Sequence, residues 1–331
     1  MANPPNPDLI LVQHDPNATA TPTPFQPNPA IEPGTFSIFP TATFSALANN
    51  EPDLDPEKIW SIPSGNLSWG IPDPAILFPK SENQITVLIM GSDQRPNDGG
   101  YRTDVRQLAI INKETKVISL MSFPRDLYVY LPGYSMERIN TSQVRGGWDL
   151  TADMFEYNFG VRPDHWGLIN FSGFVSFIDT LGGVNVQVSG TLTDWLTGYG
   201  NYTISPGLVH MNGTTALWYV RSRYTTSDFD RGRRQQEVLL AIFDRLMNFD
   251  TLTVSKNLYD QYQSAIQTDL DLNEFLSLLS LAPEFAAGNI SRYSISRSEV
   301  IPWTDPLSGA QVLLPKPELI REVFSAALNV P

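Results

Sequence analysis

The chain has 331 residues, of which 41% are hydrophobic and 17% are charged, a balance typical of a globular protein. Its formal net charge of −13 argues against nucleic-acid binding as the main role, because phosphate backbones are bound by basic surfaces. The absence of cysteine excludes disulfides, thiolate metal sites and cysteine nucleophiles. No run approaches the roughly 20 apolar residues that a membrane-spanning helix needs.

Residues 1–75 are rich in proline, threonine and asparagine, and residues 1–57 carry seven acids but no lysine or arginine. Such a composition buries too little apolar surface to offset the entropy of the chain. We therefore expect a disordered, proline-stiffened stalk or linker, although an ordinary disordered terminus without a role fits the composition equally well. The folded domain is expected over residues 76–331.

Three apolar segments open this domain. Residues 85–90 end at Gly91 and predict a strand that is buried on both faces. Residues 105–111 and 116–121 predict two further strands, joined by a hairpin turn at 112–115.

Helical signals follow. Helices are predicted over residues 150–159, before Gly160, and from about residue 171 to Gly182, and residues 184–188 alternate like a half-exposed strand.

The longest helical pattern runs from about residue 233 to residue 248. Asp271 and Glu274 have the spacing of a capping box for a helix over 272–281, and Pro317 stands at a typical first helical position. Strands and helices interleaved in this order predict a layered α/β or α+β domain.

The first candidate cluster is Asp93, at the end of a buried strand, with Arg102 and Asp104 at the start of the next. Two carboxylates across one loop suit magnesium, which prefers oxygen ligands and bridges to phosphates. The alternative is that Asp93 caps a turn and Asp104 pairs with Arg102.

The second cluster is Arg125-Asp126, after a proline, with Arg138 shortly beyond. The proline restricts the backbone before Arg125, and a guanidinium is the planar partner of a phosphate oxygen pair. The alternative is a surface ion pair between Arg125 and Asp126 with little energetic consequence.

The third cluster has five arginines within fourteen positions of an acidic chain: Arg221, Arg223, Arg231, Arg233 and Arg234. Their place before a helix N-terminus, where backbone N–H groups lack partners, favours an anion site. The alternative is a solvated basic face, although the use of arginine throughout favours phosphate recognition.

Other chemistries have little support. The sequence contains no Walker A loop, GxSxG elbow or HExxH helix, and its three histidines are not spaced as a metal set. His165, beside Asp164, is a candidate base, but a lone histidine that opens a strand is more often structural.

In this order the clusters resemble the LytR-CpsA-Psr family of cell-wall ligases over about residues 84–247. The matching stretches are residues 89–93, 102–104, 122–129, 138–140, 181–184, 213–223 and 228–236. The resemblance implies a three-layer α-β-α sandwich with a central mixed sheet and a hydrophobic channel for a polyprenyl chain. It also implies transfer of an anionic glycopolymer from a polyprenyl pyrophosphate to a peptidoglycan sugar hydroxyl.

Carried over position by position, Asp93 and Asp104 would hold Mg²⁺, with Mn²⁺ as the alternative ion. The catalytic residues would be Asp93, Asp104 and Arg125. The pyrophosphate would be bound by Arg102, Arg125, Arg138, Arg221, Arg223, Arg231, Arg234 and Gln235.

The chain departs from the family pattern at two positions and at its start. Lysine is common at the position of Arg138, and glycine is usual where Asp230 stands, so the Asp230 carboxylate could weaken the anion site or orient Arg231. The resemblance implies a membrane helix before the stalk, which this chain lacks. An extracytoplasmic, membrane-anchored location and a trimmed or processed form are therefore expected.

Two rival functions remain open at the level of the sequence. One is a hydrolase of polyprenyl pyrophosphates, and the other is a non-catalytic binder of anionic glycan or lipid.

Overall fold

The computed structural model describes residues 71–94, 102–223, 227–247, 266–271, 273–274, 277–278, 290–306 and 308–328. The chain divides after Asp53, and all described residues belong to the unit Leu54–Pro331. The predicted stalk lies outside the described residues except for 71–75. This short segment contacts the folded body, since the Ala75 N–H donates to the Tyr157 carbonyl at 2.7 Å.

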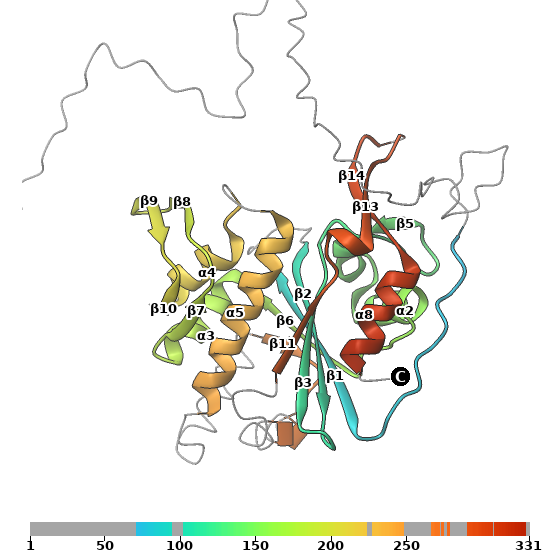
Figure 1. Ribbon diagram of the computed structural model, residues 1–331, viewed down its shortest axis with the longest axis horizontal. Helices are drawn as coiled ribbons and strands as arrows, with labels where there is room; N and C mark the ends of the chain where they lie inside the picture. Colours follow the sequence, from blue (N-terminus) through green and yellow to red (C-terminus); the bar gives the residue numbers. More distant parts are fainter. Residues whose placement is uncertain are drawn as a thin grey trace, which may run out of the picture. The chain divides into compact units, whose positions relative to one another are not determined.

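A six-stranded mixed sheet, in the order β11-β6-β1-β2-β3-β12, forms the centre of this unit (Figure 1). The strands are β1 (Gln84–Ser92), β2 (Thr103–Asn112), β3 (Val117–Ser122), β6 (His165–Asn170), β11 (Ile266–Thr268) and β12 (Ile290–Ser294). β2 is antiparallel to both β1 and β3, whereas β6 is parallel to β1 and β12 is parallel to β3. The three predicted strands and the hairpin that joins the last two are confirmed.

Helices cover both faces of the sheet. They are α2 (Ser142–Phe159), α3 (Phe171–Thr180), α4 (Gly213–Arg221), α5 (Asp228–Met247) and α8 (Pro317–Leu328). Alternate residues of a strand point to opposite faces. Leu88 and Leu108 therefore pack against α2 and α8, while Val87 and Ala109 face α5. The predicted α-β-α sandwich is confirmed.

Four two-stranded sheets surround these layers. Their strands are β4 (Tyr128–Tyr130) with β5 (Met136–Arg138), β7 (Val184–Val188) with β10 (Gly207–Met211), β8 (Leu192–Leu196) with β9 (Gly200–Ile204), and β13 (Val300–Thr304) with β14 (Gln311–Pro315). Two 3-10 turns, η1 (Ile139–Thr141) and η3 (Arg297–Glu299), complete the described elements. β7 alternates between buried and exposed residues as predicted.

The helix ends follow the local sequence in most places. Gly160 ends α2 with a φ of 73°, a left-handed conformation that glycine adopts without steric cost. α2 also contains a break at Gly146 and Gly147, after which it covers the predicted helix over 150–159. Pro317 is the first residue of α8, as predicted.

The start of α5 differs from the prediction, since the helix begins at Asp228 rather than near residue 233. Its first turn has a single apolar residue, Phe229, which is too few to show an apolar period. A capping box explains the earlier start: the Asp230 N–H donates to Ser227 Oγ at 3.2 Å, and the Ser227 N–H donates to Asp230 Oδ2 at 3.1 Å. Asp230 therefore caps the helix that carries the arginines.

The predicted helix over 272–281 lies largely outside the described residues. Its capping box is present, since the N–H groups of Asp271 and Glu274 donate to each other's carboxylates at 2.9 Å and 2.8 Å. Among the described helices, none combines the length and apolar character needed to cross a bilayer.

Candidate active site

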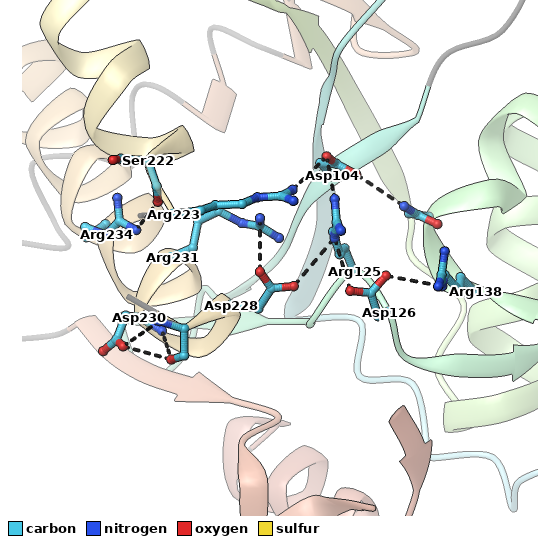
Figure 2. Close-up of polar contacts among 12 residues, drawn as sticks. Asp104, Arg125, Asp126, Arg138, Ser222, Arg223, Asp228, Asp230, Arg231 and Arg234 are labelled. Carbon is cyan, nitrogen blue, oxygen red and sulfur yellow. Dashed lines mark hydrogen bonds and ion pairs between the residues drawn. The ribbon is translucent and has the colours of Figure 1, made fainter. Parts of the chain in front are cut away.

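Seven charged residues from five parts of the chain meet where β1 ends and β2 begins, and we call them the charge cluster (Figure 2). Its members are Asp104, Arg125, Asp126, Arg138, Arg223, Asp228 and Arg231. They come from β2, the turn after β3, the end of β5, the segment after α4 and the first turn of α5.

Asp104 is the centre of the cluster. Its Oδ2 accepts from Arg125 Nη1 and from Arg223 Nη2, each at 3.3 Å. Its Oδ1 accepts from Asn140 Nδ2 at 3.2 Å. One carboxylate therefore joins three segments that are far apart in the sequence.

Asp126 and Asp228 extend this network on either side of Arg125. Arg125 Nε lies 3.1 Å from Asp126 Oδ2 and 3.5 Å from Asp228 Oδ2. Arg231 Nη1 lies 3.1 Å from Asp228 Oδ1, and Arg138 Nε lies 3.3 Å from Asp126 Oδ1. The Arg125–Asp126 pair is thus one part of a network rather than an isolated surface ion pair.

A glycine brings α5 close enough to the sheet for these contacts. A Cβ atom added to Gly232 would lie 2.4 Å from Ser122 Oγ at the end of β3, closer than non-bonded atoms approach. The missing side chain lets the first turn of α5 lie against β3, and Arg231 on that turn reaches the same cluster as Arg125.

The network shifts several pKa values. Burial raises the pKa of Asp104, but Arg125, the Asn140 hydrogen bond, Arg231 and Arg223 together outweigh it, and the pKa of Asp104 is lowered. Burial is the main cause that lowers the pKa of Arg231, and repulsion by Arg223 and Arg125 adds to it. Within the cluster, four arginines face three aspartates, and this excess of positive charge favours an anion.

The two predicted metal ligands have different surroundings. Asp93 follows β1, and its Oδ1 accepts from the Arg102 N–H at 2.7 Å, as the turn-capping alternative expected. Asp104 pairs with Arg125 and Arg223. Because Ser92 pairs with Thr103 in the sheet, the two carboxylates follow neighbouring strand residues. In the described ranges, no three histidine, aspartate or glutamate side chains cluster closely enough to enclose a metal ion.

Beside the charge cluster lies an apolar cavity of about 300 Å³, between the sheet and helices α3, α4 and α5. This volume is at the lower end of the range for small-molecule pockets. Val105 lines the cavity next to Asp104, and the two predicted ligands Arg221 and Gln235 also line it. The predicted hydrophobic channel therefore has a counterpart in the structure, and its wall includes two polar side chains near the cluster.

Four of the arginines expected to bind the pyrophosphate take different positions: Arg221, Arg223, Arg231 and Arg234. Arg223 and Arg231 extend toward Asp104 and Arg125, whereas Arg234 lies beside Ser222, away from Asp104 (Figure 2). Arg221 stacks its guanidinium over the Phe171 ring at 3.9 Å from the ring centroid.

Arg234 is almost fully buried and lies apart from the charge cluster in Figure 2. Its guanidinium donates to the carbonyls of Ser222, at 2.6 Å, and of Tyr219. Both carbonyls belong to the last turn and the C-cap of α4, so Arg234 ties the end of α4 to α5.

The remaining predicted residues lie at the edges of the site. The exposed side chain of Arg102 follows the loop between β1 and β2, and its backbone holds Asp93. His165 stands opposite Val87, five residues before Ser92 on β1, and it contacts Asp269 at 3.4 Å. The structure therefore gives His165 no place in the charge cluster.

Three residues that contact predicted ligands were not among the predicted site residues: Asp126, Asn140 and Asp228. All lie within the motifs that identified the arginines, and each contacts a predicted ligand. The available signal was an acid or amide beside every clustered arginine, since buried or crowded guanidinium groups need acceptors.

The chain is similar in sequence to known cell-wall transferases. Polyisoprenyl-teichoic acid–peptidoglycan teichoic acid transferase TagU of Oceanobacillus iheyensis is 29% identical over 254 residues, which are 74% of this chain and 76% of TagU. The corresponding transferase TagT of Bacillus subtilis is 29% identical over 208 residues, but these span only 61% of this chain and 65% of TagT.

A solved structure of TagT bound to LIIa-WTA shares the fold, with a TM-score of 0.61 and 23% identity over 78% of this chain and 97% of that one. A model of the LytR_cpsA_psr family matches residues 49–323, which is most of the chain. This chain therefore belongs to the LytR_cpsA_psr family.

Proposed function

We propose that this protein transfers an anionic glycopolymer from a polyprenyl pyrophosphate carrier to a sugar hydroxyl of the cell wall. The observation that carries the proposal is that the apolar cavity reaches the strand ends where the charge cluster lies: Gly91 and Val105 line the cavity, and Arg221 and Gln235 stand on its wall. A prenyl pyrophosphate has the same two parts, a charged head group and an apolar tail.

The arginines of the cluster suit the head group. A guanidinium presents paired N–H donors to phosphate oxygens, and charged hydrogen bonds of this kind are the strongest that side chains make. Arg125, Arg223 and Arg231 are held in place by carboxylates, so their positions are set before a substrate arrives. Phosphoryl transfer depends mainly on such positioning and charge neutralisation.

The relatives support the reaction class. TagU and TagT are named as transferases of teichoic acid from a polyisoprenyl carrier to peptidoglycan, and TagT has been solved with LIIa-WTA bound. We infer the same class for this chain, with peptidoglycan as the acceptor and the extracytoplasmic envelope as its location. A membrane anchor stays a prediction.

The reaction exchanges one phosphorus–oxygen bond for another. The oxygen of the acceptor hydroxyl attacks the phosphorus on the sugar side and releases its proton, and the bond from this phosphorus to the bridging oxygen breaks. Prenyl phosphate leaves with the bond's electron pair. Arg125, Arg223 and Arg231 would stabilise the charge that builds up on the phosphoryl oxygens.

Magnesium or manganese fits this site as part of the proposal. Asp93 and Asp104 provide carboxylate oxygens, the donor type that these ions prefer, and two such residues with substrate phosphates and water suffice for Mg²⁺. When bound, the ion would neutralise phosphate charge. Asp104 would then exchange some of its arginine contacts for the metal.

One assay separates the proposed function from its two rivals. The purified protein is incubated with a prenyl pyrophosphate-linked saccharide and a soluble wall glycan, with Mg²⁺, with Mn²⁺ and with a chelator. Saccharide attached to the glycan supports the transferase. Release of phosphate without attachment would favour the hydrolase, and binding without turnover would favour the non-catalytic binder.

A further inference from the structure

The hairpin of β8 and β9 has two different faces. In its register Trp195 pairs with Asn201 and Thr193 pairs with Thr203, so these four side chains share one face, which we call the outer face. Leu192 and Leu196, which alternate with Thr193 and Trp195 along β8, are buried on the other face. The Trp195 side chain is 67% exposed, although tryptophan is usually well buried in proteins.

Packing does not require an exposed ring at this position. The inner face already fixes the hairpin, since the Tyr202 and Trp218 rings meet edge to face with centroids 5.2 Å apart. Trp218 Nε1 also donates to the Trp195 carbonyl at 3.2 Å, a contact that any residue at position 195 could make. The packed hairpin therefore holds the Trp195 ring in position, but the packing of the hairpin does not depend on that ring.

The same strand is connected to the charge cluster. Asp194 Oδ2 accepts from the Arg223 N–H at 3.1 Å and from the Ser222 hydroxyl. The Arg223 guanidinium in turn donates to Asp104. Consecutive residues of β8 thus face the site on one side and solvent on the other.

We propose that the outer face binds a neutral glycan strand, the acceptor of the transfer. This inference rests on the proposed transferase function and names the surface that its acceptor uses. The C–H face of a sugar ring is apolar and packs on an aromatic ring, while hydroxyl and amide groups bond to the sugar hydroxyls. Trp195, Asn201, Thr193 and Thr203 provide both kinds of group.

The charge of the hairpin argues against a membrane as the binding partner of the outer face. Residues 191–206, which contain the whole hairpin, have no lysine or arginine, and Asp194 is their single charged residue. Anionic bilayer surfaces attract basic segments, so this hairpin gains nothing from their charge. A neutral polymer of sugars matches a surface of one aromatic ring, one amide and two hydroxyls.

The test measures binding of two probes to the intact protein. Chitin oligosaccharide, as a neutral glycan, and a short-chain prenyl pyrophosphate are titrated into wild type, Trp195→Ala, Trp195→Phe and Leu208→Ala. Leu208 is a matched control, because it is 70% exposed on the neighbouring strand β10. Thermal unfolding of each variant verifies that it folds.

We expect Trp195→Ala to lower glycan affinity at least about tenfold, because an aromatic anchor dominates such a contact. Trp195→Phe should recover part of it, and Leu208→Ala should change nothing. Unchanged glycan affinity in Trp195→Ala would overturn the proposal, as would wild type that binds anionic vesicles but no glycan. The affinity for the prenyl pyrophosphate should be equal in all four proteins. If wild type does not bind the prenyl pyrophosphate, this result would instead contradict the proposed transferase function.

Discussion

The charge cluster and the apolar cavity adjoin, but each is stabilised by a different kind of interaction. In the cluster every arginine contacts an aspartate, and each such contact offsets part of the cost of removing charge from water. The cavity wall consists mainly of strand and helix side chains such as Val105, Ala109 and Phe243, which need no partners. A change in the cluster therefore leaves a charge unpaired, whereas a change in the cavity alters only shape.

This difference implies that the two regions bind different parts of one ligand. The binding free energy that each region contributes should therefore change independently of the other. Removing a charged partner should affect turnover and head-group affinity, and blocking the cavity should affect only the discrimination between long and short lipids. The following predictions test that separation.

The largest effect is expected for Asp104→Ala. This change removes the acceptor shared by Arg125 and Arg223 and one of the two proposed metal ligands. We expect transfer to fall at least about 100-fold, the range for losing one preorganised charge at a reacting group. The measurement is the initial rate of glycan labelling at saturating Mg²⁺.

Asp153→Ala provides the control, because Asp153 pairs with Arg162 on the surface, away from the cluster. Its rate should equal that of wild type. An Asp104→Ala variant with near-normal activity that still depends on Mg²⁺ would remove both the metal assignment and the central role of Asp104.

A smaller effect separates Arg231 from Arg234, which lie three residues apart on α5. Arg231→Lys should weaken binding of a short-chain prenyl pyrophosphate about 10- to 100-fold, since the paired N–H donors are lost while the charge stays. Arg234→Lys should leave that affinity nearly unchanged but lower the stability, because it breaks contacts to the carbonyls of Tyr219 and Ser222.

Titration calorimetry and thermal unfolding of both variants measure the two quantities. Equal losses of affinity would show that Arg234 also reaches the pyrophosphate, as its place in the sequence motif suggested.

The cavity can be tested with Ala109→Phe, which adds a ring to a wall residue that is almost fully buried. Affinity for a long-chain prenyl pyrophosphate should fall about tenfold, equivalent to roughly 1.4 kcal/mol. Inorganic pyrophosphate should bind as it does to wild type. Equal affinity for the long lipid would mean that the tail lies elsewhere.

The smallest effect is expected for Asp230→Ala, which removes the capping box at the start of α5. Stability should fall by about 1 kcal/mol at neutral pH. Hydrogen bonds from Ser227 lower the pKa of Asp230, so its contribution is complete above the ordinary aspartate pKa and is lost as the pH falls through the lowered value. The two proteins should therefore become equally stable in acid.

Denaturant unfolding at several pH values measures this convergence. A gain in pyrophosphate affinity without a loss of stability would support the other interpretation, in which the Asp230 carboxylate weakens the anion site.

Much of this architecture could be predicted from the sequence. Strands with mainly apolar residues, such as 85–90, and helices ended by glycine, as at Gly160, can be recognised from the neighbouring residues alone. The start of α5 could not be found in this way, because its first turn is held by the polar pair Ser227 and Asp230 rather than by apolar spacing.

The same difference between local sequence patterns and tertiary contacts applies to the residues of the site. Proximity in sequence identified Arg223 and Arg231 as well as Arg234, but only the fold decides which guanidinium reaches Asp104 and which bonds to main-chain carbonyls. Likewise, Asp228 gains its role because α5 lies against β3, a tertiary contact that no local pattern encodes.

The strand order of the central sheet also has a consequence for how the protein is made. Both outer strands, β11 and β12, come from residues beyond 265, and β12 pairs with β3 from the first half of the chain. During synthesis the inner four strands are complete long before either neighbour emerges, and their unpaired N–H and C=O groups stay open to pairing with other chains. Nascent chains that stop after α5 should therefore aggregate or need a chaperone, although they already contain every residue of the charge cluster.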